Sequence, residues 1–188
     1  SKHQINRSVK KEDFYLYVGG LEERKNISFL INELEAAQLK LKKQIYLKCI
    51  SKLNSAEASL QEKIKNSDLS IQICEDLSDD DLFASYQQAK ALIIPSLVEG
   101  FGIPLVEAMQ MGTPLIVSDI EVFKEITDQA AFFFNPIKTG ALSELIIKAE
   151  LNEISLEKFT QSGFSVAGRY DWKTMAKETM QTYNEILK

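Results

Sequence analysis

Short apolar runs along the chain alternate with longer segments in which apolar residues recur at helical spacing. The runs are rich in aromatic and β-branched residues, which predicts strands, and the longer segments predict amphipathic helices. The predicted strands are residues 14–18, 44–50, 69–73, 91–94, 114–117 and 130–134. The predicted helices are residues 26–41, 56–65, 78–89, 104–111, 122–127, 140–151, 155–167 and 172–187.

This alternation predicts the fold class. Strands separated by helices form right-handed βαβ units, so we expect an α/β protein with a doubly wound, parallel, six-stranded Rossmann-like sheet. The uniformly apolar strands agree, because parallel strands are covered on both faces. After Pro136 only helical segments follow, which predicts a helical C-terminal extension. The polar residues 1–12 are expected to be a linker, and residues 13–188 a single domain.

Composition and charge narrow the class of protein. Of the 188 residues, 45% are hydrophobic and 26% are charged, which is typical of a soluble globular domain. We find neither an apolar run long enough to cross a membrane nor a signal peptide, so we expect a cytoplasmic protein. The net charge of −5 argues against nucleic acid as a partner. Cys49 and Cys74 end short apolar runs and are expected to be buried free thiols, as suits a reducing compartment. The chain starts with Ser1 rather than Met, which suggests a fragment of a longer protein.

The segment PSLVEGFGIPLVEAM, residues 95–109, carries the densest candidate chemistry. Its glycines and Pro104 exclude one continuous helix, so Glu99 is placed in the loop after the fourth strand. Glu107 is placed in the first turns of the next helix, with Pro104 at the first helical position. Strand, glycine turn and helix form the layout with which open α/β sheets hold a phosphate or a sugar nucleotide. Both carboxylates are expected to face the crevice at the carboxyl ends of the strands.

A second candidate group follows the first strand. Gly19 and Gly20 end that strand, and paired glycines let backbone amides approach a ligand. Arg24 and Lys25 come next, and two adjacent cations can neutralise a diphosphate. The residues alone leave open the alternative that both cations are solvated near a helix start. Asn26 is expected to cap that helix.

Three ordered blocks, YVGGLEERKN, EGFGIPLVEAM and SDIEVFKEI, resemble the retaining glycosyltransferases of family 4, also called group 1. These enzymes have the GT-B architecture, and Glu99 and Glu107 match their E-x7-E signature. The resemblance covers residues 14–136 well and the helical tail loosely, to about Tyr183. It implies that the chain is the C-terminal, donor-binding domain, and that the N-terminal acceptor domain is absent from it.

The resemblance also assigns roles to individual residues. Glu99, the predicted catalytic residue, would face the transferred sugar near the reacting centre, and Glu107 would accept hydrogen bonds from the ribose hydroxyls. Lys25 would contact the donor diphosphate. The family often has an arginine where Gly20 stands, which leaves Arg24 as the candidate for that second phosphate contact. The residues predicted to bind the donor are Gly19, Gly20, Arg24, Lys25, Leu77, Gly100, Phe101, Gly102 and Glu107.

Three further features are interpreted with the family in mind. The triplet Asp79–Asp81 has the DxD form that other glycosyltransferases use for a metal, but it precedes an apolar helix. Capping by Ser78 or Asp79 therefore explains it, and no metal or other cofactor is expected. His3, the only histidine, lies in the polar tail and is not expected to act as a base. Trp172 either contacts the N-terminal domain or packs on its own sheet.

For the complete protein, the resemblance implies a hexosyltransferase of bacterial surface polysaccharide or lipopolysaccharide biosynthesis. GDP-mannose is the favoured donor and a glycan or lipid-linked acceptor the expected partner, with possible peripheral association at the inner face of the membrane. The fragment alone should be inactive, because the acceptor half is missing. The alternatives are a non-catalytic nucleotide- or sugar-binding regulatory module of the same fold and a nucleotide-sugar epimerase of GT-B architecture.

Overall fold

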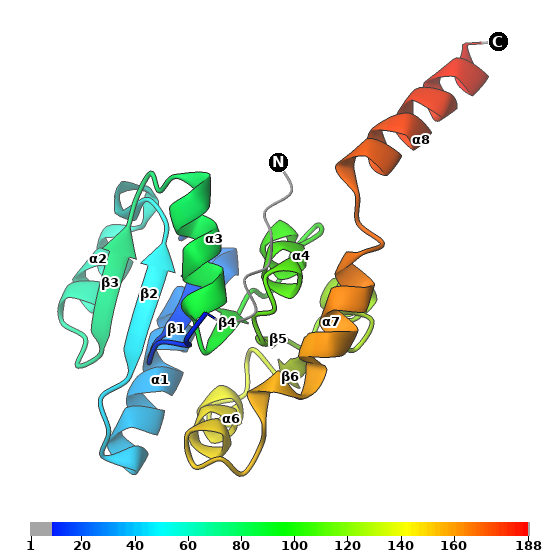
Figure 1. The fold of residues 1–188 in the computed structure, drawn as a ribbon. Coiled ribbons are helices and arrows are strands. Elements are labelled where there is room, and N and C mark those ends of the chain that lie inside the picture. The colour runs from blue at the N-terminus through cyan, green and yellow to red at the C-terminus, as the bar shows by residue number, and fades with distance from the viewer. Residues whose placement is uncertain (1–8, 188) are drawn as a thin grey trace.

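A computed structural model describes residues 9–187 and shows one six-stranded sheet (Figure 1). The strand order is β3-β2-β1-β4-β5-β6, and all neighbouring strands run parallel. The strands are β1 Tyr15–Val18, β2 Tyr46–Ile50, β3 Ser70–Cys74, β4 Ala91–Ile94, β5 Leu115–Ser118 and β6 Phe132–Phe134. The doubly wound parallel α/β fold predicted from the sequence is therefore confirmed.

Helices cover both faces of the sheet. On one face α1 packs against α2 and α6, and on the other α4 packs against α3, α5 and α7. The helices are α1 Ile27–Leu41, α2 Ala58–Lys65, α3 Asp79–Gln88, α4 Ile103–Gln110, α5 Glu121–Thr127, α6 Ala141–Glu150, α7 Thr160–Ala167 and α8 Trp172–Ile186. Short 3₁₀ turns are η1 Glu23–Lys25, η2 Leu53–Ser55 and η3 Leu156–Phe159. The central strands β4 and β5 are buried along their whole length, as expected for strands that helices cover on both faces of the sheet.

The chain reverses its direction across the sheet at β1. It runs from β1 outward to β3 and then crosses back to β4, which pairs with β1 at Tyr15↔Ala91 and Leu16↔Leu92. In open α/β sheets, ligands bind outside the carboxyl ends of the strands at such a reversal. A ligand site is therefore expected at the loops that follow β1 and β4.

Two details of the helices differ from the sequence-based expectation. Residues 155–167, predicted as one helix, form η3 and then α7, and Phe159, the last residue of η3, has φ −102° and ψ 0°. Helix α4 begins at Ile103, so Pro104 occupies the second helical position rather than the first. Pro104 is tolerated there because the first turn of a helix has amide groups without intrahelical partners.

The two cysteines are both free thiols in the structure. Cys49 is buried in β2, and burial raises the pKa of its thiol to about 12. Cys74, at the end of β3, is only half-buried. The prediction of a buried free thiol is confirmed for Cys49, whereas Cys74 is more accessible than expected.

At the amino edge of the sheet, a charged cluster joins four separate segments. The Glu150 carboxylate is 4% exposed and accepts hydrogen bonds from Lys43 Nζ at 2.6 Å and from the Tyr15 hydroxyl at 2.7 Å. Lys90 Nζ contacts the same carboxylate and also pairs with Asp13 at 2.7 Å. These contacts fasten the end of α6 to the start of β1 and to the segments that precede β2 and β4.

The start of the chain was predicted to be a linker up to residue 12. Residues 1–8, which include His3, lie outside the described residues. Within the described part, the backbone N–H of Glu12 donates to the Gln88 carbonyl at 2.7 Å. This end of the predicted linker therefore lies against the domain.

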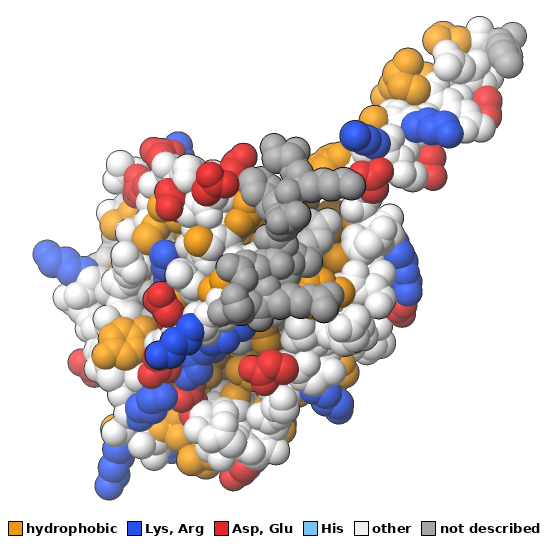
Figure 2. All heavy atoms as spheres, viewed as in Figure 1, with side chains coloured by type: hydrophobic (Ala, Val, Ile, Leu, Met, Phe, Trp, Pro, Cys, Tyr) orange, Lys and Arg blue, Asp and Glu red, His pale blue; other side chains and the backbone are white. Residues whose placement is uncertain are grey.

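Helix α8 projects away from the body of the domain (Figure 1). None of its residues is buried, and apolar side chains lie along it in the open (Figure 2). Asp171 caps it by accepting a hydrogen bond from the Thr174 amide. Trp172 is 68% exposed, so it does not pack on its own sheet, and the predicted contact with another domain stays a prediction. Across residues 9–187, helices long and apolar enough for a bilayer span are lacking.

Candidate functional site at the switch point

A cavity of about 290 Å³ opens at the carboxyl ends of β1 and β4. Its lining includes Tyr17 of β1, Lys25 of η1, Ser96 and Glu99 of the loop after β4, and Phe101 of the glycine turn. Residues from both candidate segments of the sequence therefore meet at the point where the strand order reverses. This confirms that the two segments converge in space.

The two cations and the carboxylate form a direct ionic contact. Lys25 Nζ lies 2.6 Å from Glu99 Oε1, and Arg24 Nη1 lies 3.2 Å from Glu99 Oε2. The side chains of Lys25 and Glu99 are only 15% and 10% exposed, whereas that of Arg24 is 49% exposed. Arg24 and Lys25 are therefore not simply solvated, which answers the alternative left open by the sequence.

The environment of Glu99 keeps it ionised. Burial raises the pKa of its carboxyl, but hydrogen bonds from Lys25 and Ser96, together with the attraction of Lys25 and Arg24, outweigh burial. The pKa of Glu99 consequently lies below its ordinary value. Ser96 is fully buried, and its hydroxyl donates to Glu99 Oε1 at 2.8 Å, which fixes the carboxylate at the edge of the cavity.

Asn26 connects the loops around this site. It has the left-handed backbone conformation, with φ at 60°, and its side chain makes no helix cap, contrary to the expectation. Its Nδ2 instead donates to the carbonyls of Pro95, at 3.2 Å, and Pro136, at 3.0 Å. The Leu97 amide adds a hydrogen bond to the Arg24 carbonyl at 2.8 Å. The loops after β1, β4 and β6 are thereby held in fixed positions relative to one another.

The glycines differ in what they contribute. Gly102 has φ +102°, and a Cβ there would lie 3.1 Å from the Phe123 ring, so a side chain would be strained and crowded. Gly19 also has a positive φ, at +150°. Gly100 has no positive φ, and a Cβ there would meet nothing within 4 Å. The fold therefore does not require a glycine at this position, but the open space around it could admit a ligand. Gly20 likewise needs no special backbone conformation, and its carbonyl accepts a hydrogen bond from the Tyr17 hydroxyl.

Glu107 lies in a neighbouring cavity of about 350 Å³ between α4 and the start of α8. Phe101 and Ile103 line both cavities and separate them. We expected one crevice around Lys25, Glu99 and Glu107, and the structure places them in two adjoining cavities instead. The Phe101 ring also packs edge-on against Tyr170, with ring centroids 5.6 Å apart.

The surroundings of Glu107 raise the pKa of its carboxyl, whereas those of Glu99 lower it. Burial raises the pKa of Glu107, and repulsion from Asp79 adds to this effect. The Tyr86 hydroxyl donates to Glu107 Oε2 at 2.8 Å and partly compensates, but the pKa remains above its ordinary value. The two signature glutamates thus differ in how readily they take up a proton.

The segment before α3 behaves as a cap. The Ser78 hydroxyl oxygen accepts a hydrogen bond from the Asp81 amide at 3.2 Å, and the three aspartates occupy the first turn, which confirms the capping interpretation. Among residues 9–187 we find no group of three His, Cys, Asp or Glu side chains placed to hold a metal. Metal independence nevertheless stays a prediction. Leu77 is half-buried at the carboxyl end of β3 and lines neither cavity, so its role is also untested.

Three residues of the site escaped sequence reasoning. Ser96 stands three positions before Glu99, so its contact could have been anticipated from a tight turn. Asn26 was noticed only as a helix cap. Tyr86 gave no signal, because its partner Glu107 lies 21 positions further on and in a different helix.

The sheet order and its helical cover are those of a Rossmann-like domain. Comparison with known proteins identifies the family. The family described as glycosyl transferases group 1 matches residues 1–166. The chain therefore belongs to the group 1 glycosyltransferases.

Individual relatives give the same result. The chain is 31% identical to the O-antigen chain mannosyltransferase RfbU of Salmonella typhimurium, over 93% of this chain and 48% of that protein. It is 25% identical to the O-antigen chain mannosyltransferase B of Escherichia coli, over 92% of this chain and 46% of that protein. The chain thus spans less than half the length of these relatives. Sucrose-phosphate synthase from Thermosynechococcus elongatus shares the fold, with a TM-score of 0.75 at 22% identity over 94% of this chain and 46% of that one.

Proposed function

We propose that this chain is the donor-binding part of a retaining hexosyltransferase that uses a nucleoside diphosphate sugar. The observation that carries the proposal is the pair formed by Lys25 and Glu99, 2.6 Å apart in a cavity at the switch point of the sheet. A lysine there can bind phosphate oxygens, and a carboxylate beside it can accept hydrogen bonds from sugar hydroxyls. The glycine turn at residues 100–102 could add backbone N–H groups that stabilise the departing diphosphate.

The remaining donor contacts are part of the same proposal. Arg24 supplies a second cation for the diphosphate, and Glu107 binds the ribose hydroxyls. Leu77 and the backbone around it contact the nucleobase. The bond to the diphosphate breaks on the same face of the sugar on which the acceptor hydroxyl attacks, and a phosphate oxygen takes the hydroxyl proton. No metal or cofactor is required.

Two relatives named as O-antigen chain mannosyltransferases support mannose as the transferred sugar, with GDP-mannose as the donor. By the same support, the acceptor is a glycan or a lipid-linked glycan of surface polysaccharide synthesis. The acceptor would bind outside this chain, at the inner face of the membrane. The names of these relatives do not favour the alternative of a non-catalytic regulatory module.

The test is a thermal shift of the 188-residue chain with GDP, UDP and ADP. A ligand at a hundredfold excess over its dissociation constant adds about 2.7 kcal/mol to the free energy of unfolding. We expect the largest shift with GDP and no shift from mannose alone. Lys25→Met should weaken the binding of GDP about tenfold or more, because a charge-assisted hydrogen bond is lost. A chain that responds to none of the three nucleotides would contradict the proposal.

A further inference from the structure

Tyr86 occupies an unusual position behind Glu107. It is fully buried in α3, yet its hydroxyl reaches across to α4 and donates to Glu107 Oε2 at 2.8 Å. Burial raises the pKa of the Tyr86 hydroxyl far above its ordinary value, so the group stays protonated and remains a donor. A buried tyrosine normally satisfies its hydroxyl with a partner, but this partner is a carboxylate in the wall of a cavity.

The tyrosine is itself held in place. The Thr113 hydroxyl donates to the Tyr86 carbonyl at 2.6 Å, and both groups are buried. This contact satisfies a carbonyl in the last turn of α3, where intrahelical partners run out. The backbone that carries Tyr86 is therefore tied to the segment before β5, and because the ring is fully buried, its hydroxyl has little room to move.

We infer that Tyr86 is a positioning residue, whose hydroxyl holds one oxygen of Glu107 so that the other oxygen is presented to the ribose diol of a nucleoside diphosphate. This inference rests on the proposed function. A diol is recognised best by a carboxylate that is both ionised and fixed in orientation, because a free rotor must be ordered on binding. Tyr86 favours both conditions, because its hydroxyl fixes one oxygen and a hydrogen-bond donor favours the charged form against the opposing effects of burial and Asp79.

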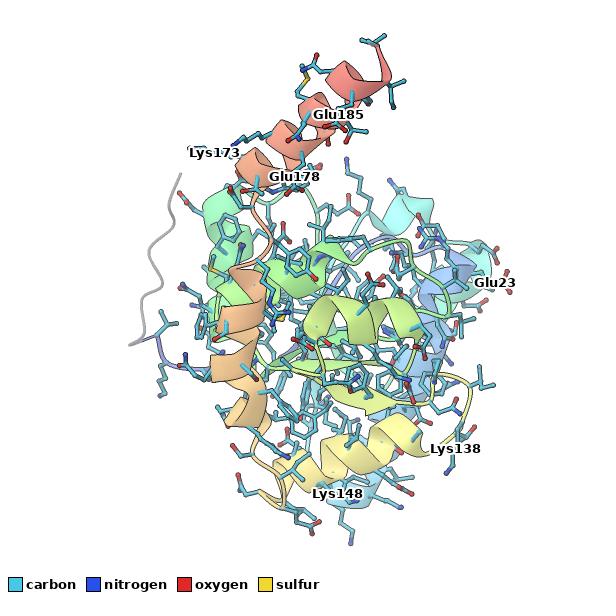
Figure 3. The ribbon with its side chains drawn as sticks, turned by 90° about the vertical axis from the view of Figure 1, so that its right-hand side faces the viewer. Glu23, Lys138, Lys148, Lys173, Glu178 and Glu185 are labelled. Atoms are coloured by element: carbon cyan, nitrogen blue, oxygen red, sulfur yellow. The ribbon has the colours of Figure 1, made fainter. Side chains whose placement is uncertain are left out.

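The charges around Glu107 make this support necessary. Asp79 approaches from α3 and disfavours a second negative charge. Asp171 and Glu178 line the same cavity from the segment around α8, and Arg169 is the cation of that lining. Glu178 lies on α8, the helix that projects from the body of the domain (Figure 3). Arg169 is paired with Asp128 at 2.8 Å, so it is not free to neutralise Glu107.

The matched pair of variants is Tyr86→Phe and Tyr15→Phe. Each removes one hydroxyl from a buried tyrosine that donates to a carboxylate, Glu107 in the first case and Glu150 in the second. Tyr15 starts β1 at the amino edge of the sheet, away from the site. Both variants should lose folding stability. Only Tyr86→Phe should also weaken the binding of GDP, by about tenfold, because a hydrogen bond to a charged group is lost.

Two readouts separate positioning from a general loss of structure. The affinity advantage of GDP over its 2′,3′-dideoxy form should shrink in Tyr86→Phe and persist in Tyr15→Phe. Binding should also weaken at low pH as Glu107 takes up a proton, with a midpoint that moves to higher pH in Tyr86→Phe. Titration of the GDP phosphates affects all variants alike and cancels in the comparison.

The outcomes distinguish this inference from the proposed function. If the wild-type chain binds GDP, but Tyr86→Phe keeps the wild-type affinity, diol preference and pH midpoint, the inference is wrong and the proposed function stands. If the wild-type chain binds no nucleotide, the proposed function fails. Titration of the Glu107 carboxyl by carbon-13 NMR in the free chain then decides whether the Tyr86 hydroxyl holds this carboxylate. An unchanged pKa in Tyr86→Phe would refute the positioning contact itself.

Discussion

The ion pair between Lys25 and Glu99 leads to an unexpected prediction for Glu99→Gln. Two cations share one carboxylate, at 2.6 Å and 3.2 Å, so the three side chains together carry a charge of +1 (two positive, one negative). The substitution raises this local charge to +2 and keeps an amide that can still accept the Ser96 hydrogen bond. We therefore expect Glu99→Gln to bind GDP more tightly than the wild-type chain, even though it loses the carboxylate proposed to be catalytic.

The magnitude follows from Coulomb's law. A phosphate that contacts Lys25 would lie roughly 6 Å from the Glu99 carboxylate, where an effective dielectric constant of about 20 gives a repulsion of about 2.8 kcal/mol. Water in the open cavity roughly doubles the dielectric constant and leaves about 1.4 kcal/mol, which is about tenfold in affinity. The free energy of unfolding should fall by about 1–2 kcal/mol, because the two cations lose their partner.

Isothermal titration calorimetry with GDP at about 50 and about 200 mM salt measures this effect, since salt screens the added charge. The gain should be larger at the lower salt concentration. For GDP-mannose the gain should be smaller, because the proposed contact of Glu99 with the sugar is lost. Glu121→Gln is the control, since Glu121 is 92% exposed at the start of α5 and its loss changes the net charge equally. A Glu99→Gln chain that binds GDP no more tightly than the wild type at low salt would refute the reasoning.

Two further predictions concern the stability of the fold. Gly102→Ala should lower the free energy of unfolding by about 1–3 kcal/mol, because φ +102° and the Phe123 ring both oppose a side chain. Gly100→Ala, the control, should leave the free energy of unfolding nearly unchanged. Urea unfolding followed by circular dichroism compares the two variants, and equal losses would contradict the argument. Glu150→Gln should cost about 1–3 kcal/mol at neutral pH. Burial raises the pKa of Glu150, but hydrogen bonds from Lys43, Lys90 and Tyr15 outweigh burial and lower the pKa below its ordinary value. The ionised Glu150 therefore contributes fully to the free energy of unfolding above the ordinary pKa of a glutamate, about 4.3, and this contribution disappears as the pH falls through the lowered pKa. The variant should consequently lose less stability in acid than the wild-type chain. An unchanged dependence of stability on pH would show that the cluster contributes nothing.

The elements of the fold could be predicted because their signals are local. The strands β4 and β5 are apolar on both faces, and Ser78 with the following aspartates marks a helix start within four residues. The break between η3 and α7 was missed because it has no proline, and the single glycine of this stretch, Gly163, lies inside α7. There the glycine packs against Met109, where a Cβ would come within 3.3 Å. That close packing of α7 on α4 depends on the tertiary structure.

The site could be predicted only as far as its two loops. Parallel strands bring the segments after β1 and β4 to one edge, so the meeting of Lys25 and Glu99 follows from topology. The contacts of Asn26 span 69 and 110 positions along the chain and depend on where the loop after β6 returns. The division into two cavities depends on how Phe101 and Ile103 are oriented, which no spacing in the sequence specifies.

The exposed position of Trp172 has a practical consequence for experiments on this chain. It is the only tryptophan among the 188 residues, and it stands at the base of α8 rather than in the core. Its fluorescence will therefore report on the surroundings of that helix and of the cavity beside Glu107 rather than on the interior of the sheet. The buried Tyr15, Tyr17 and Tyr86 rings are the intrinsic optical probes of the core, and emission from Trp172 is better used to detect whatever comes to cover α8.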